Sequence, residues 1–338
     1  MSQPATTTAP EAADRRVSLV VAINQALREE MARDPAVYVL GEDVAVGGPF
    51  GATAGLAELY GEGRVRNTPI SEGSIMGTAV GMAVLGLRPV VEIMFVDFIT
   101  LAMDQLVNHA AKLHYLSGGQ LRVPLVVRAQ CGVMGGWGAH HSQSLEAWFV
   151  HVPGLKVVMP ATPADARGLL KAAIRDDNPV VFVENRALYW GLGDVPPGEG
   201  LVPLGQAAVR QAGGDVTVLA TGRLVGEALA AARDLTGEGI AAEVIDLRSL
   251  VPLDLDSVLA SVRKTGRVVV AHEAVLPGGY GAELTAQVQR AAFDYLDAPI
   301  ERVGAPFAPV PASPSLEAAF LPGRAEVAAA VRAALGRR

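Results

Sequence analysis

The chain has 338 residues, of which half are hydrophobic, and its formal net charge is -7 at pH 7. This length allows two domains, because compact domains usually contain about 100 to 200 residues. The acidic balance and the lack of clustered Lys and Arg exclude a nucleic-acid surface, since phosphate contacts need concentrated positive charge. No stretch reaches the ~18 apolar residues without charge that a membrane span requires, which excludes a membrane protein of that kind.

The N-terminal segment and the single cysteine both bear on location. Residues 1–16 are rich in Ala, Thr and Pro. They lack the cationic start and apolar core of a signal peptide, so a disordered tail is expected. Cys131 is the only cysteine and cannot form an internal disulfide. A lone cysteine is typical of a reducing compartment, and the sequence therefore predicts a cytoplasmic location.

Helix-like and strand-like patterns alternate from residue 17 to residue 190. A helix is predicted over 18–33, and further helices over 99–116 and 163–176, from their apolar periodicity. Between them lie short apolar runs typical of strands buried on both faces: VYVLG, RPVVEIMFV, VPLVVRA, LKVVMP and NPVVFVEN. Alternation of this kind predicts an α/β domain with a parallel sheet covered on both sides.

The stretch GLGDVPPGEG contains six Gly and Pro among its ten residues and predicts an interdomain linker over 191–204. Residues 205–338 then repeat the alternation on a smaller scale. Strands are expected over 215–222, 240–247 and 266–273, and helices over 224–235, 253–263 and 324–335. The sequence therefore predicts a second, smaller α/β domain.

Glu72 lies in the stretch RNTPISEGS, and fifteen uncharged residues separate it from Arg88. Pro69 favours an extended approach and Ser71 is a possible N-cap, so a helix is predicted to begin at about Glu72. An acid in the first turn is stabilised by the helix dipole. An ordinary helix-start carboxylate is therefore one interpretation of Glu72.

The helix predicted after Glu72 has three glycines spaced four residues apart, at Gly73, Gly77 and Gly81. Each glycine costs up to ~1 kcal/mol of helix stability relative to Ala, so close approach of another backbone or a flat ligand is expected in compensation. The other faces are apolar, which predicts a helix buried all round. Burial disfavours the charged form of a carboxyl group, and Glu72 is then suited to share a proton with a nitrogen base.

Several long motifs resemble the β subunit of the E1 component of 2-oxo acid dehydrogenase complexes. They are TPISE, RPVVEIMFVDFITLAMDQLVNHAAK, HSQSLEAWFVHVPGLKVVMP and AIRDDNPVVFVEN, in the family's order. The resemblance implies a thiamine diphosphate pyrimidine-binding domain over 17–190, with a transketolase-like parallel sheet, and a transketolase C-terminal-like domain over 205–338. It also implies an α2β2 heterotetramer that holds the cofactor between the E1 α subunit and this chain.

The resemblance implies roles for five residues. Glu72 matches the carboxylate that hydrogen-bonds N1′ of the aminopyrimidine ring, and Ile70, Met94 and Phe98 match apolar residues around that ring. For these three, ordinary core packing is an alternative of nearly equal weight. His141 matches the histidine that faces the reacting atoms, where imidazole can pass protons or hold a carboxylate. The neighbouring His140 stands where the family has glutamine, which leaves two histidines able to face inward.

Two ion sites follow from the same resemblance. Four positions match a monovalent-cation site, usually potassium, built mainly from backbone oxygens: Leu125, Ala173, Asp176 and Asn178. A helix end followed by an Asn-Pro turn is the alternative. The chain contains no Gly-Asp-Gly, with which the family's motif for Mg²⁺ and diphosphate begins, so Mg²⁺ is expected on the α subunit.

The implied reaction is oxidative decarboxylation of a 2-oxo acid, with pyruvate as the first candidate, and acyl transfer to the lipoyl group of E2. The C-terminal domain resembles the part that contacts E2 and the other β chain. Acetoin and branched-chain 2-oxo acid dehydrogenase E1 β subunits are alternatives. Two further classes are a nucleophilic enzyme using Cys131 with His140 or His141, and a noncatalytic scaffold, against which a buried Glu72 would argue.

Overall fold

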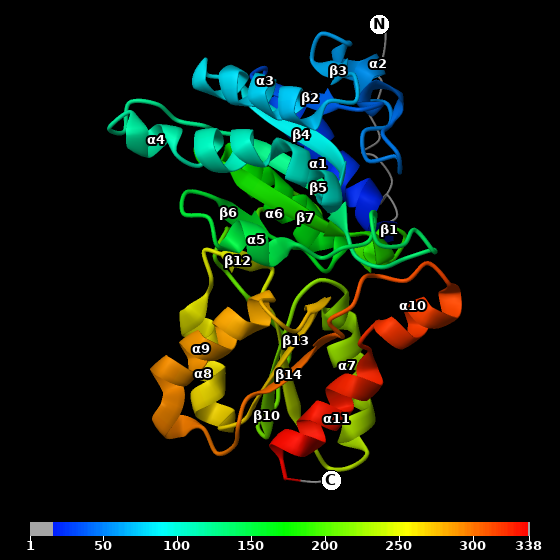
Figure 1. Ribbon diagram of the computed structural model, residues 1–338, viewed down its shortest axis with the longest axis vertical. Coiled ribbons are helices and arrows are strands. Elements are labelled where there is room, and N and C mark those ends of the chain that lie inside the picture. The colour runs from blue at the N-terminus through cyan, green and yellow to red at the C-terminus, as the bar shows by residue number, and fades with distance from the viewer. Residues whose placement is uncertain (1–15, 337–338) are drawn as a thin grey trace, which may run out of the picture.

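The computed structural model describes residues 16–336. Its two large sheets lie one beyond the other along the long axis of the molecule (Figure 1). The first sheet has seven strands in the order β12-β6-β7-β5-β4-β2-β3. Their bounds are β2 (Val37–Gly41), β3 (Val65–Asn67), β4 (Arg88–Phe95), β5 (Val126–Cys131), β6 (Lys156–Val158), β7 (Val180–Asn185) and β12 (Ser249–Val251). All pairs are parallel except β12 with β6, so the predicted parallel sheet is confirmed.

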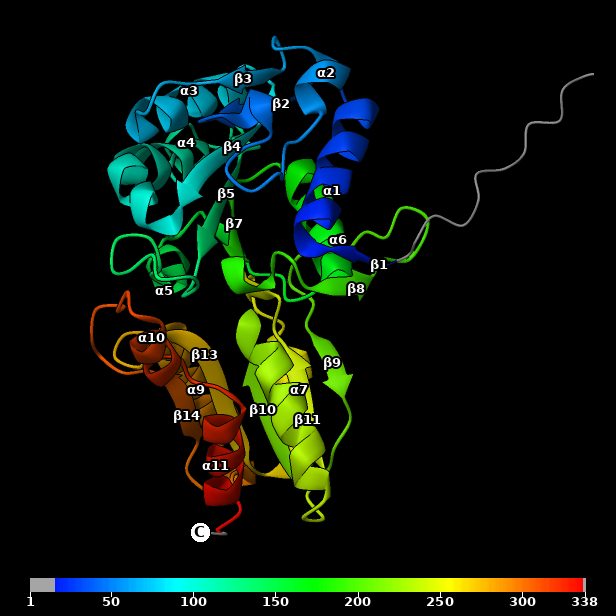
Figure 2. The same ribbon diagram turned by 90° about the vertical axis from the view of Figure 1, so that its right-hand side faces the viewer.

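The first sheet is buried on both faces because successive residues along each strand point to opposite sides. On one side Val90, Val126 and Val180 pack with α1 (Leu19–Arg33) and α6 (Pro163–Arg175). On the other side the next residues in each strand pack with α3 (Glu72–Val84) and η2 (Val96–Ala102). Figure 2 shows α1 and α6 on one side of this sheet and α3 and α4 (Leu113–Leu116) on the other.

The single helix predicted over 99–116 is wrong. This part of the chain forms a 3₁₀ segment η2, a π-helical segment η3 (Asp104–Ala110) and the short α4. It crosses the glycine face of α3, where Gln105 lies beside Gly77 and the Leu101 carbonyl beside Gly73. Close packing against two glycines explains why the segment departs from regular α-helical geometry, and such departures are frequent at functional sites.

The second sheet has five strands in the order β14-β13-β10-β11-β9. Their bounds are β9 (Ala208–Gln211), β10 (Val216–Ala220), β11 (Ala242–Asp246), β13 (Val268–Val275) and β14 (Glu301–Ala305). Only the edge strand β9 is antiparallel to its neighbour. One face packs with α7 (Arg223–Thr236) and α11 (Arg324–Ala334) and the other with α8 (Leu255–Thr265) and α9 (Tyr280–Ala292).

The two halves are joined by more than the chain between them. Within the predicted linker, β8 (Leu192–Asp194) pairs antiparallel with β1 (Arg16–Ser18). Beyond it, β12 leaves the second half and pairs with β6 of the first sheet. The remaining short helices are η1 (Val44–Val46), α2 (Leu56–Tyr60), α5 (Glu146–Val150), η4 (Arg186–Leu188), η5 (Phe293–Tyr295) and α10 (Pro314–Phe320). Within residues 16–336, no helix has both the length and the apolar character to cross a bilayer.

Three neighbouring strands of the first sheet are tied together by a buried ionic cluster. Arg128 on β5 donates to Glu184 on β7 at 2.7 and 3.0 Å and to Glu92 on β4 at 2.6 Å. All three side chains are almost fully buried. Burial alone would lower the pKa of Arg128, but the charges of Glu184 and Glu92 raise it above its ordinary value. The Tyr189 hydroxyl also donates to Glu184, so both carboxylates are partnered.

Replacing Arg128 by Leu should destabilise the protein strongly, by about 3 to 5 kcal/mol, because two buried carboxylates lose their cation. Arg122→Ala is the matched control, since Arg122 is 69% exposed in its pair with Asp177, and it should cost less than about 1 kcal/mol. Denaturant unfolding followed by circular dichroism measures both. Equal, small losses for the two variants would contradict the structural importance of the cluster.

Candidate active site

Glu72 is the first residue of α3 and is 7% exposed, as the sequence predicts. The predicted side-chain cap is wrong, because the Ser71 hydroxyl donates to Ser74 Oγ at 3.0 Å and caps no backbone N–H. The Ser71 backbone has a ψ of 76°, outside the extended range usual at an N-cap. The helix therefore begins at Glu72 without side-chain capping, and the Glu72 carboxyl is enclosed at its first turn.

The prediction that α3 is buried all round is also wrong. Its buried residues form one stripe against the sheet: Ile75, Met76, Ala79, Val80 and Ala83. Gly77 and Gly81 are exposed, and a Cβ added to Gly81 would meet no atom within 4 Å. Part of the uncharged segment 73–87 therefore lies on a surface that this chain does not cover. Three apolar side chains are exposed on or beside it: Ile70 at 81%, Leu85 at 85% and Leu101 at 64%.

A second acid lies near Glu72 and was not predicted from the sequence. Glu42 follows β2, at the carboxyl end of a parallel strand, which is the edge where α/β proteins place their sites. Partial burial and the negative charges of Glu72 and Asp43 raise the pKa of the Glu42 carboxyl. The pair of acids Glu42 and Glu72 thus interacts electrostatically. The signal available in the sequence was Glu-Asp directly after the strand VYVLG.

His141 lies among aromatic rings. Its ring centroid is 4.9 Å from that of Phe95, 5.3 Å from Phe98 and 5.9 Å from Trp137. Phe95 and Phe98 meet it edge to face, an arrangement favoured by the ring quadrupoles. His141 is half-buried, whereas His140 is exposed. Of the two candidate histidines, His141 is therefore the one held at the ends of β4 and β5.

The other residues expected around the cofactor ring lie in different surroundings. Met94 and Phe98 are half-buried at the end of β4 and in η2, and Phe98 joins this region to His141. Ile70 is largely exposed two residues before Glu72. Sequence reasoning missed Phe95 and Trp137, although both are next to predicted residues in the motifs EIMFVDF and GGWGAHH.

Residues 132–145, here called the His141 loop, are fixed from within the first domain by Arg186. Its guanidinium donates to the carbonyls of His141 at 2.9 Å and Gly132 at 3.0 Å, and to Ser142 Oγ at 3.2 Å. It also lies 5.3 Å from the centroid of Phe95. Burial lowers the pKa of Arg186, and nearby negative charges only partly oppose this effect. Arg186 is thus a buried cation that holds the backbone beside His141.

The second domain holds the same loop from the opposite side. Glu273 accepts from the Val133 N–H at 2.6 Å, and Glu317 accepts from the Gly136 N–H at 2.8 Å. Gly136 has a φ of 77°, and a Cβ there would lie 2.9 Å from the Ala312 carbonyl oxygen. Glycine at this position therefore permits both the left-handed backbone and the close approach of the second domain.

The four positions matching a cation site meet where α6 ends and β7 begins. The Leu125 carbonyl accepts from Val180 N–H at 2.8 Å, and the Ala173 carbonyl from Asp176 N–H at 3.2 Å. The Asp176 carbonyl accepts from Arg88 at 3.0 Å. The Asn178 side chain donates to Asp176 Oδ1 at 2.9 Å. The carbonyl oxygens of Leu125, Ala173 and Asp176 thus each accept one hydrogen bond in these contacts and keep a second lone pair.

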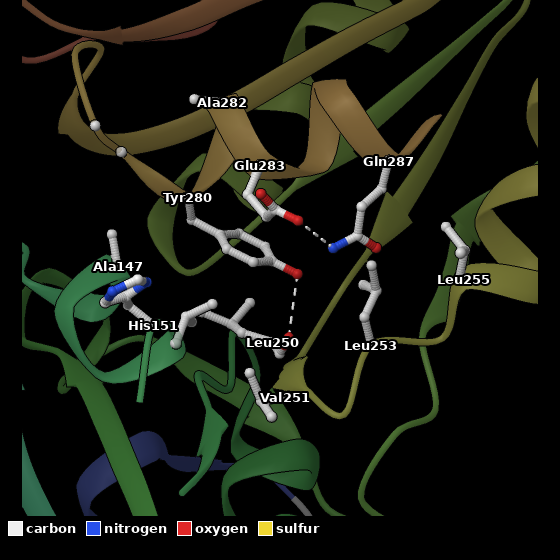
Figure 3. A pocket seen from close by; sticks show the side chains of 13 residues that line it. Ala147, His151, Leu250, Val251, Leu253, Leu255, Tyr280, Ala282, Glu283 and Gln287 are labelled. Carbon is white, nitrogen blue, oxygen red and sulfur yellow. Dashed lines mark hydrogen bonds between the residues drawn. The ribbon is translucent and has the colours of Figure 1, made fainter. Parts of the chain in front are cut away.

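A cavity of about 800 Å³ lies between the domains, away from the predicted site residues, and is lined by α5, the segment after β12 and α9 (Figure 3). Its polar groups are paired with one another: Tyr280 donates to the Leu250 carbonyl at 3.2 Å, and Gln287 to Glu283 at 2.8 Å. The Gly-rich turn HEAVLPGGYGAEL supplies Tyr280. Glu72 and His141 line neither this cavity nor the smaller ones.

Comparison with known proteins identifies the family of each domain. "Transketolase, pyrimidine binding domain" matches residues 15–190, and "Transketolase, C-terminal domain" matches residues 205–327. The chain is 46% identical to the acetoin:2,6-dichlorophenolindophenol oxidoreductase subunit beta of Cupriavidus necator, over 94% of this chain and 97% of that protein. It is 45% identical to a mitochondrial pyruvate dehydrogenase E1 component subunit beta-1 of Oryza sativa subsp. japonica, over 96% and 88%.

The chain belongs to the E1 β-subunit family of pyruvate, acetoin and branched-chain 2-oxo acid dehydrogenases. The fold agrees: a split-gene transketolase described as an inactive beta4 tetramer matches with a TM-score of 0.77 and 28% identity, over 95% of this chain and 98% of that one. The relatives act on different substrates, so membership in the family does not select among them.

The alternative of a cysteine nucleophile is wrong for this E1 β chain. Cys131 is fully buried at the end of β5. Burial raises the pKa of its thiol well above the ordinary value, and the negative charges of Glu146 and Glu273 raise it further. The thiolate that nucleophilic attack needs is thus disfavoured. His141 packs against Phe95 and Phe98, and His140 points to the surface.

Glu146, at the start of α5, is a buried acid that sequence reasoning missed. It is 1% exposed, and its Oε2 has no hydrogen-bond partner among the described residues. Burial raises the pKa of this carboxyl to about 7; a backbone hydrogen bond at its own residue opposes the rise, and the charge of Glu273 adds to it. Near neutral pH the native state therefore holds a proton that an unfolded chain would release.

Glu146→Gln should stabilise this protein more at pH 8 than at pH 5. Because the pKa of Glu146 is raised from 4.5 to about 7 on folding, wild-type stability falls as the pH rises between these values, and the full cost is present above pH 7. The Gln variant avoids that cost, which is about 1 to 3 kcal/mol. Thermal unfolding across this pH range measures the effect.

Glu58→Gln is the control for this measurement, because Glu58 is exposed in α2. It should leave the pH dependence of the unfolding midpoint unchanged. A pH dependence shared by wild type and Glu146→Gln would contradict the assignment of the titration to Glu146.

Proposed function

We propose that this chain and an E1 α subunit together form an α2β2 enzyme that decarboxylates a 2-oxo acid oxidatively and transfers the acyl group to the lipoyl group of E2. Pyruvate is the proposed substrate, with acetoin and branched-chain 2-oxo acids as alternatives. The observation that carries the proposal is that the enclosed acid Glu72, on α3, and the half-buried His141 both lie on segments that contact η2. Gly73 of α3 packs against Leu101 of η2, and Phe98 of η2 contacts the His141 ring.

The residues around Glu72 fit one end of thiamine diphosphate. An aminopyrimidine ring needs a carboxyl group at a ring nitrogen and apolar side chains at its faces. Glu72 is an enclosed carboxyl group, and Ile70, Met94 and Phe98 each keep exposed surface. When bound, the cofactor supplies a nucleophilic carbon and an electron sink. Glu72 would hydrogen-bond the ring nitrogen N1′ and hold or release a proton there.

His141 would serve the substrate side of the site. Its imidazole can donate or accept a proton at a ring nitrogen, or hold the substrate carboxylate. Phe95, Phe98 and Trp137 pack around the ring and leave it half-buried. Arg186 holds the His141 carbonyl and so orients the backbone that carries the imidazole.

The remaining parts of the site would come from the α subunit. Within residues 16–336 no group of three or more His, Cys, Asp or Glu side chains is placed to hold a metal ion, and we assign Mg²⁺ and the diphosphate to the partner chain. The exposed part of α3 around Gly81, with Ile70, Leu85 and Leu101 beside it, would be covered by that chain. We further propose that the second domain contacts E2 and that the enzyme is cytoplasmic.

Glu72→Gln should abolish turnover while the α2β2 tetramer stays intact, because the amide cannot exchange a proton with the cofactor nitrogen. Wild-type and variant chains are reconstituted with the α subunit and thiamine diphosphate, and pyruvate, acetoin and branched-chain 2-oxo acids are compared with an artificial electron acceptor. Size-exclusion chromatography reports assembly. We expect at least a ~100-fold loss of kcat.

The chain alone should be inactive with all three substrates, since it holds only part of the site. Glu58→Gln serves again as an exposed control and should keep wild-type turnover. Full activity of assembled Glu72→Gln would refute the proposed role of Glu72.

We also propose that potassium binds at the turn formed by Leu125, Ala173, Asp176 and Asn178. The carbonyls there can each accept one more interaction, and carbonyl oxygens suit a hard cation. KCl should therefore raise the unfolding midpoint more than N-methylglucamine chloride at equal ionic strength. Asp176→Ala should reduce the difference, because Asp176 Oδ1 accepts from the backbone N–H and the side-chain amide of Asn178 and so shapes the turn. An equal effect of the two salts on the wild type would favour the alternative, a turn held by protein donors alone.

A further inference from the structure

Trp137 is the most exposed of the three aromatic rings that contact His141. Of the three rings that contact the imidazole, Phe95 is only 4% exposed and belongs to the core. Phe98 is half-buried and is already assigned to the cofactor ring. The Trp137 indole is 45% exposed, with its centroid 5.9 Å from that of His141. It is therefore the ring at the boundary between the packed core and the open space that a substrate would enter.

The indole is held in place on several sides. The guanidinium of Arg186 lies 5.2 Å from its centroid, a cation–π contact that gains strength because Arg186 is buried. Phe95 and Phe50 lie 5.4 and 6.2 Å away. The preceding residue, Gly136, is bound through its N–H to Glu317 of the second domain. The ring contacts of Trp137 thus all come from the first domain, while the second domain holds the backbone next to the indole.

A fixed, bulky side chain at this place restricts the substituent of the substrate. In a 2-oxo acid the side chain is attached to the carbonyl carbon that reacts, so it lies one bond from the atoms that His141 serves. Space taken by the indole is space that a branched substituent cannot use. A small change in substituent size against an apolar wall commonly alters kcat/KM about 10- to 100-fold.

We infer that Trp137 is a specificity-determining residue and that it restricts this enzyme to substrates with a small acyl substituent, of the size of a methyl group. The inference rests on the proposed function, because it takes His141 as the residue that faces the reacting atoms. It goes further by naming the substrate class and the side chain that selects it.

The test compares wild type, Trp137→Ala and Trp137→Phe, each assembled with the α subunit and thiamine diphosphate. The measured quantity is kcat/KM for 3-methyl-2-oxobutanoate divided by kcat/KM for pyruvate, or for acetoin if that is the small substrate accepted. Wild type should favour the small substrate. Trp137→Ala should raise the ratio about 10- to 100-fold and Trp137→Phe by less, since a phenyl ring keeps part of the wall.

Trp190→Ala is the matched control. Trp190 is 52% exposed and belongs to the same aromatic cluster through Phe50 and Tyr189, but no contact between its ring and that of His141 is found in the described residues. It should leave the ratio unchanged. A merely structural role of Trp137 would lower kcat/KM for both substrates together, and the ratio separates the two cases.

Three results would overturn the inference: a wild type that prefers the branched acid, an unchanged ratio in Trp137→Ala with pyruvate turnover retained, or an equal shift in Trp190→Ala. If Trp137→Ala loses all activity, Trp137→Phe decides, and an unchanged ratio there overturns it. A wild-type tetramer that accepts none of the three substrates overturns the proposed function and this inference together, whereas turnover with an unshifted ratio removes the inference alone.

Discussion

The position of the site depends on the ionic cluster of Arg128 with Glu92 and Glu184. Each residue of the cluster lies close to the end of its strand. On β4, Glu92 comes three residues before Phe95, and on β7, Glu184 comes two residues before Arg186. On β5, Arg128 comes three residues before Cys131, after which the His141 loop begins. Bidentate pairing of a guanidinium with a carboxylate fixes distance and orientation together. The cluster therefore sets the relative register of three strand ends, and through it the place of the imidazole.

The second domain helps to hold the candidate active site in place. Its carboxylates Glu273 and Glu317 accept hydrogen bonds from backbone N–H groups of the His141 loop, while Arg186 donates to carbonyls of the same loop. A glycine-rich loop has little conformational preference of its own. The hydrogen bonds from Arg186 and those to Glu273 and Glu317 fix the backbone of the His141 loop instead, so a glycine-rich segment adopts one conformation.

Local pattern was sufficient for most of the fold and insufficient for the surroundings of the site. Apolar runs between helical periods predicted the parallel strands and α6, and the start of α3 at Glu72 followed from Pro69 and Ser71. The conformation of residues 99–116 depends on their packing against glycines of α3. The burial of α3 depends on which of its faces the rest of this chain covers. Phe95, Trp137, Arg186 and Glu146 could not be found because their importance lies in contacts between distant segments, which periodicity does not encode.

The pairing of β12 with β6 gives the second domain a protective role for the first. Without β12, the backbone N–H and C=O groups of β6 would form an unpaired edge, and such edges recruit strands from other molecules. A first domain produced alone would thus be prone to aggregate even if its core were intact. The first domain thus depends on the second half of the chain to cover this edge, which ties correct assembly to complete synthesis of the polypeptide.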